Sequence, residues 1–280
     1  MELSLAVTLA VLLAALMHAA WNAMVKRGGD TLLEMALLAL AASALSLPML
    51  PLVPLPAPAA RPFLFASMLL HVGYYATLVA TYKRVDLSVG YPLMRGTAPL
   101  LVTLAGVLLL GEHPTPVVWA GIVLICLGVV SLSLVGARQA GVARALPFAL
   151  ANAALIASYT LVDAAGARAS GNATSYVLWM YFLEGVPFGL LVGWLRGRAL
   201  LDAARARWRI ALAAGACSAL AYGIAVWAMT VAPVGAVSAL RETSVVFALC
   251  LGRWLLKERL DARRWLGIAA VLAGALSLRI

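Results

Sequence analysis

The segment from Val85 to Leu132 occurs twice in this chain, and this repetition constrains the fold more than any other feature. An ungapped shift of 146 positions lays it on the segment from Val231 to Leu278. Shared leucines would mean little in an apolar chain, but the matches also include Arg95 with Arg241, Thr97 with Thr243, Gly106 with Gly252, Glu112 with Glu258, Trp119 with Trp265, Gly121 with Gly267 and Gly128 with Gly274. The chain is therefore a tandem duplication.

Composition places this duplication in a lipid bilayer. Hydrophobic residues make up 64% of the 280 residues, charged residues make up 11%, and the mean hydropathy is +1.00, whereas soluble domains are about half apolar and a quarter charged. A spanning helix needs about 20 apolar residues, so about ten helices fit. The net charge of +10 would suggest a nucleic-acid partner for a soluble protein. Here the basic residues lie in short gaps between apolar runs, so we expect no nucleic-acid partner.

The apolar runs divide into two sets of five. We expect helices at residues 3–25, 31–53, 62–82, 87–110 and 115–135, and again at 146–165, 173–195, 210–231, 234–256 and 262–280. Between Arg196 and Arg209, Arg alternates with Ala and Leu, which suggests a short amphipathic turn at the membrane surface. The predicted units are a first repeat at 1–135, a linker at 136–145 and a second repeat at 146–280.

The basic residues of the connections predict the orientation. The odd-numbered connections carry 15 Lys and Arg, whereas the even-numbered connections and both ends carry 3. By the positive-inside rule, the odd connections face the cytoplasm and both termini lie outside it, in a multi-pass protein of the bacterial inner membrane. An odd number of helices in each half also inserts the two repeats upside down relative to each other. The predicted fold is an all-α integral membrane protein with ten transmembrane helices in two inverted five-helix repeats, as in many secondary transporters.

Two motifs carry a family resemblance. The segment from Tyr91 to Pro99 reads YPLMRGTAP and is followed by Gly111 and Glu112, while LRETSV at 240–245 is followed by KER at 257–259. Each half also ends in a Trp-x-Gly-Ile helix. Over essentially its whole length, the chain resembles the EamA-type members of the drug/metabolite transporter superfamily. This resemblance implies secondary carriage of a small metabolite through a central cavity between the halves.

The resemblance leaves the substrate open, because members of the superfamily carry amino acids, sugars, nucleotide-linked compounds, cations and other metabolites. The chain departs from the commoner pattern at one position, since Pro99 has Val245 as its repeat partner. We therefore expect the two halves to move unequally.

Arg95 and Arg241 each lie near the middle of a predicted span. A guanidinium there costs about 2.5 to 3.5 kcal/mol even on insertion scales, so neither faces lipid. In one interpretation, the pair lines the cavity and grips an anionic group of the substrate with two-pronged hydrogen bonds. In the other, each arginine ties helices together through a carboxylate such as Glu184 or Glu242. The sequence leaves both interpretations open.

Glu184 is the acidic residue that most suggests a function. It lies at the centre of the seventh predicted helix, just before Gly185 and Pro187, and an intramembrane carboxyl of this kind is typical of proton pathways. It would then allow proton coupling, whereas the structural alternative is a permanently charged partner of an arginine. Glu242 follows Arg241 directly, so their side chains project about 100° apart on a helix and need not pair with each other.

Polar and aromatic residues extend the candidate substrate site. His18 and Asn22 lie four residues apart in the first helix with Trp21 between them, which predicts a polar stripe toward the cavity or a neighbouring helix. Aromatic rings are also numerous enough to surround an organic substrate or a quaternary amine, although most could serve packing. The aromatic candidates for the substrate site are Tyr75, Tyr91, Tyr159, Trp179 and Tyr222.

The best-supported function is a secondary transporter that moves a small polar metabolite by alternating access. The two arginines favour an anion or zwitterion, such as an amino acid or a phosphonate- or carboxylate-bearing compound. An amine or organic cation bound by the aromatic residues and Glu184 is the alternative. A channel and an intramembrane enzyme are remote alternatives, because the sequence shows no metal-ligand spacing, catalytic motif or phosphate-binding loop. We expect no cofactor and no metal, and the sequence leaves open the direction of transport, the coupling ion and whether the protein is a monomer or a dimer.

Overall fold

The computed structural model describes residues 3–26, 28–85, 87–134, 142–256 and 261–279, and all regular structure in these ranges is helical. The first half contains α1 (Leu5–Lys26), α2 (Thr31–Ser46), the short helices η1 (Leu47–Leu52) and η2 (Pro58–Ala60), α3 (Arg61–Tyr82), α4 (Leu87–Leu110) and α5 (Pro116–Leu134). The second half contains α6 (Val142–Ser170), α7 (Ala173–Arg196), α8 (Arg198–Val231), α9 (Val234–Arg241), α10 (Ser244–Leu256) and α11 (Ala262–Ser277).

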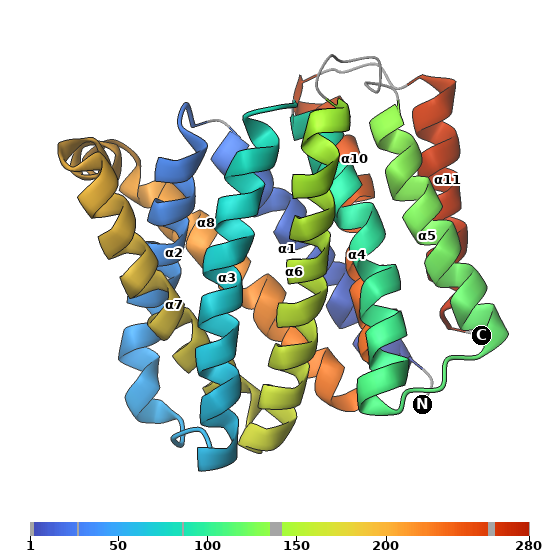
Figure 1. Ribbon diagram of the computed structural model, residues 1–280, viewed down its shortest axis with the longest axis horizontal. Helices are drawn as coiled ribbons and strands as arrows, with labels where there is room; N and C mark the ends of the chain where they lie inside the picture. Colours follow the sequence, from blue (N-terminus) through green and yellow to red (C-terminus); the bar gives the residue numbers. More distant parts are fainter. Residues whose placement is uncertain (1–2, 27, 86, 135–141, 257–260, 280) are drawn as a thin grey trace.

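The helices match the ten predicted spans, since α9 and α10 together replace the ninth. Among the described residues, eight helical stretches are long and apolar enough to cross a membrane, including a combined span at Val234–Leu251, and α5 supplies a shorter apolar helix. Both chain ends lie at the same end of the molecule, as do the α4–α5 and α8–α9 connections (Figure 1). The α1–α2, α3–α4 and α7–α8 connections lie at the opposite end, so the basic connections share one end of the molecule.

The predicted ninth helix is not continuous. It ends at Arg241 and restarts at Ser244, with Glu242 and Thr243 forming a turn. The N–H groups of Glu242 and Thr243 donate to the carbonyls of Ala239 and Leu240, three residues back. The backbone hydrogen bonds at this turn therefore span three residues instead of four, but they are not lost. This geometry often marks a hinge inside a helix. The equivalent α4 stays continuous although it contains Pro92 and Pro99.

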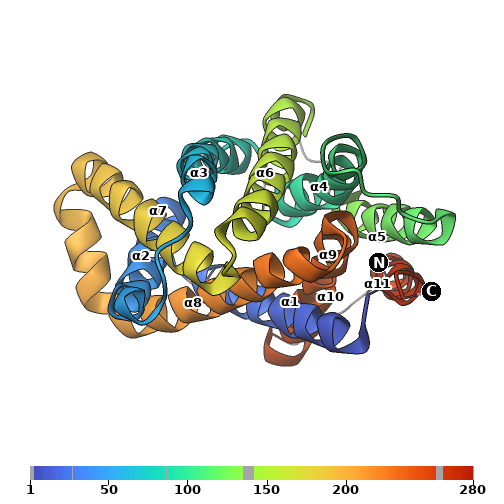
Figure 2. The same ribbon diagram turned by 90° about the horizontal axis from the view of Figure 1, so that it is seen from below.

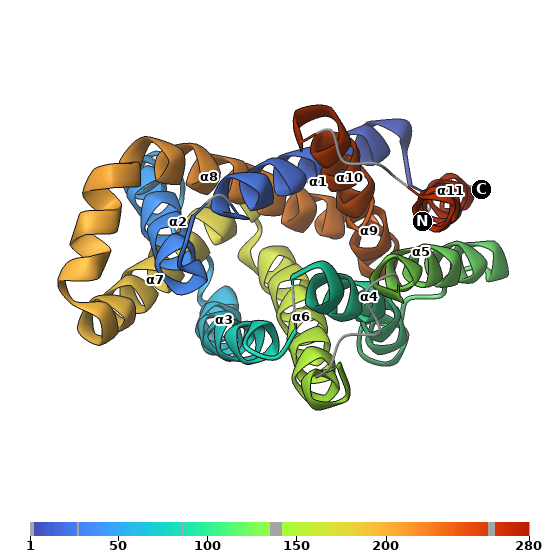
Figure 3. The ribbon, with the colours of Figure 1, turned by 90° about the horizontal axis from the view of Figure 1, so that it is seen from above.

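The stretch between Arg196 and Arg209, where the sequence suggested a short amphipathic turn, is helical. Only Gly197 interrupts the helical run, with a φ of +53°, and α8 then continues for 34 residues from Arg198. Ala, Arg and Leu are all strong helix formers, so nothing in this stretch breaks a helix. Figures 2 and 3 show that α8 is not straight, because its first part, next to the end of α7, runs across the direction of the rest of the helix. Similarly, α6 begins at Val142, inside the predicted linker, most of which lies outside the described residues.

The helices pack as two halves exchanged by an approximate two-fold relation. The contact of α1 with α8 corresponds to the contact of α6 with α3 in the other repeat. The helices α2 and α7 are equivalent in the two repeats and pack on each other, as do α5 and α11. Figures 2 and 3 show α2 with α7 at one end of the elongated outline and α5 with α11 at the other. The region between these two pairs is where both repeats contribute helices to one cavity.

Candidate functional site

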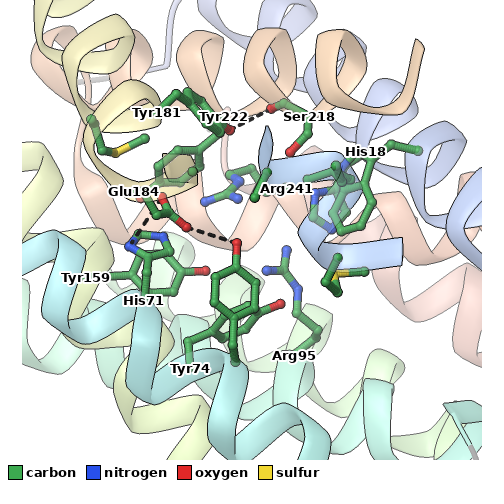
Figure 4. A pocket seen from close by; sticks show the side chains of 17 residues that line it. His18, His71, Tyr74, Arg95, Tyr159, Tyr181, Glu184, Ser218, Tyr222 and Arg241 are labelled. Atoms are coloured by element: carbon green, nitrogen blue, oxygen red, sulfur yellow. Dashed lines mark hydrogen bonds and ion pairs between the residues drawn. The ribbon is translucent and has the colours of Figure 1, made fainter. Parts of the chain in front are cut away.

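A cavity of about 80 Å³ lies between the repeats and is lined by residues of α1, α2, α3, α4, α6, α7, α8 and α9. The lining therefore comes from four helices of each half. A buried water needs about 10 to 15 Å³ of such space, so the cavity has room for several waters or a small ligand. Figure 4 shows the guanidinium groups of Arg95 and Arg241 and the carboxylate of Glu184 pointing into the same region.

Arg95 is tied to the other repeat. Its Nε donates to Oε2 of Glu242 at 3.1 Å, and its Nη2 lies 2.8 Å from Oε1. Both residues are buried, with 6% and 2% of their surfaces exposed. This two-pronged contact is the favoured geometry for an arginine and a carboxylate, and it holds α4 to the turn between α9 and α10.

Arg241 has different surroundings, although it is the repeat partner of Arg95. It is 7% exposed and lines the cavity, yet within the described part of the chain no ion pair joins it to a carboxylate. Its guanidinium carbon lies 5.0 Å from the ring centroid of Tyr222, a cation–π arrangement. Arg241 is also in the last turn of α9, where the partial negative charge of the helix end favours a cation.

The cavity also contains an acidic group. Glu184, in α7, accepts a hydrogen bond from the Tyr75 hydroxyl at 2.9 Å, and its Oε2 lies 3.9 Å from Nδ1 of His71. Nδ1 of His71 is also 2.9 Å from the carbonyl oxygen of Ser67. Glu184 is 6% exposed, so the cavity combines one buried carboxylate with Arg241.

Aromatic rings surround this carboxylate. The His71 ring stacks on Tyr159 at 4.3 Å, and the rings of Tyr74 and Tyr222 meet Tyr159 edge-on at 5.9 and 6.0 Å. Such a cluster presents ring faces and hydroxyl groups together. It can therefore hold an apolar or cationic part of a ligand as well as donate hydrogen bonds.

A second buried carboxylate does not line the cavity but contacts one of its lining residues. Asp163, in α6, is fully buried and accepts hydrogen bonds from the hydroxyls of Tyr176 and Tyr222. Tyr222 is the residue whose ring faces Arg241, whereas Tyr176 is not among the cavity-lining residues. Asp163 thus fixes the orientation of one cavity ring from outside the cavity.

The residues predicted from the sequence fall into three groups. Those lining the cavity are His18, Trp21, Tyr75, Arg95, Tyr159, Glu184, Tyr222 and Arg241. Those placed elsewhere are Asn22, whose amide donates to the His18 carbonyl, Trp179, which packs against Phe182, and Glu242, which pairs with Arg95. The side chain of Tyr91 and the corner at 257–260 lie outside the described residues.

The sequence interpretation missed several lining residues. His71, Tyr74, Tyr181 and Ser218 were not among the predicted site residues, but all four line the cavity. A helical signal was present, because His71, Tyr74 and Tyr75 lie at positions i, i+3 and i+4 on one face of α3. The described residues contain no group of three or more His, Cys, Asp or Glu that could hold a metal ion.

Comparison with known proteins supports the same architecture. The model of the EamA-like transporter family matches residues 5–134 and 143–280. A solved structure titled "Crystal structure of protein" has a TM-score of 0.73 and 18% sequence identity, and the match covers 97% of this chain and 94% of that one. At this identity the likeness shows the fold alone. No curated protein sequence matches the chain.

Proposed function

Because the chain belongs to the EamA-like transporter family, we propose that it is a secondary carrier that moves a small anionic or zwitterionic metabolite through the cavity between its repeats. The observation that carries this proposal is Arg241, a buried cation that lines the cavity and is not ion-paired to a carboxylate among the described residues. A carboxylate, phosphate or phosphonate group can accept two parallel hydrogen bonds from such a guanidinium.

The charge balance of the cavity favours a zwitterion within this class. Glu242 offsets the charge of Arg95, which leaves Arg241 and Glu184 as the principal opposite charges of the lining. A substrate with an anionic group near Arg241 and an ammonium group near Glu184 would satisfy both. An amino acid or an aminophosphonate has this pattern, and the small cavity suits a compact molecule.

An organic cation is the second candidate. It is supported by the contacting rings of His71, Tyr74, Tyr159 and Tyr222, which line the same cavity as Glu184. In this case the ammonium group would bind the rings and Glu184, while Arg241 would have no substrate group to hold.

A ligand screen separates these candidates. The purified protein is heated with glycine, aminomethylphosphonate, acetate or tetramethylammonium, because a ligand that binds only the folded state stabilises it by mass action. We expect the two zwitterions to raise the melting temperature and Arg241→Gln to abolish that increase. Stabilisation by tetramethylammonium alone, unchanged in Arg241→Gln, would support the organic cation instead.

Glu184 is also our candidate for proton coupling. It is a buried carboxyl within hydrogen-bond reach of Tyr75 and close to His71. Replacement by an amide removes the proton-binding group but keeps the shape. We expect Glu184→Gln to abolish the pH dependence of flux while substrate-induced stabilisation stays measurable. A pH profile identical to that of the original protein would exclude Glu184 as the coupling group.

A further inference from the structure

An ion pair between the two repeats lies beside the cavity. Glu34, near the start of α2, holds Arg207 of α8: Nε lies 2.6 Å from Oε1, and Nη2 donates to Oε2 at 3.2 Å. The side chains are only 9% and 23% exposed. Arg207 also donates to the carbonyl oxygen of Met24 in α1. One guanidinium therefore joins α8 to two helices of the first repeat.

The position of this ion pair suggests that it controls access to the cavity from one side of the protein. Met35, Leu38 and Ala39 line the cavity, and Met35 directly follows Glu34 in the chain. Glu34 is in the first turn of α2, so the pair lies toward the end of the molecule that carries the α1–α2 connection (Figure 1). A second bond between the repeats, from Arg196 to Asp30 at 2.9 Å, lies at the same end but is more exposed.

The opposite end has a comparable link. Glu112, in the connection after α4, accepts a hydrogen bond from the Val234 N–H at the start of α9, and its Oε1 lies 3.7 Å from Arg168 of α6. Gly111, with a φ of +65°, turns the chain so that Glu112 can reach α9. At each end, an acidic residue of the first repeat contacts an arginine of the second.

We propose that the Glu34–Arg207 ion pair is a gate, which must break before a substrate can pass between the cavity and the side of the α1–α2 and α7–α8 connections. A carrier with alternating access must close one end while the other opens. A shielded ion pair between the repeats can close an end reversibly, because its charges regain water when it breaks. The inference rests on the carrier proposed above, but its test needs no substrate, so the two can fail separately.

The test measures access to the cavity with a thiol reagent. Cys126, Cys217 and Cys250 are replaced by alanine, and Ser218, which lines the cavity, is replaced by cysteine. This substitution keeps the backbone carbonyl of residue 218, which accepts a hydrogen bond from the Tyr181 hydroxyl. The labelling rate with the membrane-impermeant sulfonatoethyl methanethiosulfonate is then measured in right-side-out and inside-out membrane vesicles.

We expect Glu34→Gln to accelerate labelling about tenfold in one vesicle orientation, which corresponds to about 1.4 kcal/mol. The predicted topology makes this the inside-out orientation. The charge exchange Glu34→Arg with Arg207→Glu should restore slow labelling. Arg207→Lys, which keeps the charge and loses the two-pronged geometry, should give a smaller acceleration in a folded protein.

Asp202→Asn is the matched control. It also removes a carboxylate beside an arginine of α8, but the Asp202–Arg205 pair lies within one helix and is 71% and 81% exposed. Its labelling rate should equal that of the unaltered cavity reporter. The gate would be refuted by an unchanged rate in Glu34→Gln, by equal acceleration in both orientations, or by the same acceleration in Asp202→Asn.

Discussion

Arg95 and Arg241 occupy equivalent positions in the two repeats, but Glu242 gives them different roles. The Glu242 carboxylate lies against Arg95 of the other repeat rather than against its chain neighbour. The sequence could indicate that Arg241 and Glu242 point in different directions on a helix. It could not indicate which distant cation Glu242 would meet, because that depends on how α4 packs against α9. We therefore propose the structural role for Arg95 and the substrate-binding role for Arg241.

The divided roles predict different effects of the same substitution. Arg95→Lys should lower the free energy of unfolding by about 1.5 to 3 kcal/mol, the value of one hydrogen bond between charged groups. Arg241→Lys should leave stability nearly unchanged but weaken ligand binding about tenfold, because an ammonium lacks the planar two-pronged geometry. Melting temperatures with and without glycine measure both quantities. Equal destabilisation in the two variants, with binding intact in Arg241→Lys, would reverse the assignment.

The two tyrosines that donate hydrogen bonds to Asp163 allow a matched comparison. Tyr176→Phe and Tyr222→Phe each remove one hydroxyl from this carboxylate, so both should lower stability by about 1 to 3 kcal/mol. Only Tyr222→Phe changes a cavity residue that faces Arg241, so only this variant should reduce the glycine-induced increase in melting temperature. An equal loss of the glycine effect in Tyr176→Phe would show that Asp163 acts on the fold as a whole.

At the scale of the helix, apolar runs and charged gaps predicted the elements well. The fourth predicted helix and α4 have identical bounds, 87–110. The turn at Glu242 and Thr243 escaped prediction because it contains neither Gly nor Pro and keeps its backbone N–H groups bonded. Conversely, α4 stays continuous through Pro92 and Pro99, as its predicted bounds imply. Breaks inside a span depend on packing, which local composition does not report.

The contact between α5 and α11 depends on glycines that the repeat pattern did indicate. A Cβ atom at Gly274 would lie 2.6 Å from the Gly121 carbonyl oxygen, and one at Gly128 would lie 2.9 Å from that of Gly267. Such small residues allow helix backbones to approach closely in a membrane. Backbone atoms cannot move aside cheaply, so the helices themselves would have to separate.

We therefore expect Gly274→Ala to destabilise the protein by about 1 to 3 kcal/mol, the usual cost of overpacking. Gly223→Ala is the matched control, because its Cβ would meet only Val177 at an ordinary 3.4 Å, and alanine favours a helix. Thermal unfolding in detergent measures both. A stabilised Gly274→Ala variant would contradict the close α5–α11 contact.

At the scale of the whole molecule, duplication and charge together suggest how the protein is inserted. Among the described residues, the basic α1–α2, α3–α4 and α7–α8 connections lie at one end and both chain ends at the other (Figure 1), and this separation agrees with the 15 to 3 division of Lys and Arg in the sequence. By the positive-inside rule, we therefore expect the termini to lie outside the cytoplasm. The Glu34–Arg207 pair would accordingly face the cytoplasm and the Glu112–Arg168 pair the outside.

Reporter fusions test this orientation. Alkaline phosphatase fused to the C-terminus should be active, and a green fluorescent protein fused at the same point should be dark, because the first reporter folds only outside the cytoplasm and the second only inside. Moving both fusions to Gly197, between α7 and α8, should exchange the results. Fluorescence at the C-terminus without phosphatase activity would reverse the topology and the side assigned to each ion pair.

Counterflow in reconstituted vesicles tests the proposed carrier most directly. Vesicles containing the protein are loaded with unlabelled glycine or aminomethylphosphonate, and the uptake of the labelled compound is followed. We expect uptake that saturates, that is accelerated by the internal compound, and that is lost in Arg241→Gln, while Tyr176→Phe retains it. Uptake of both compounds that rises linearly with concentration, or that persists in Arg241→Gln, would contradict a carrier that binds its substrate at Arg241.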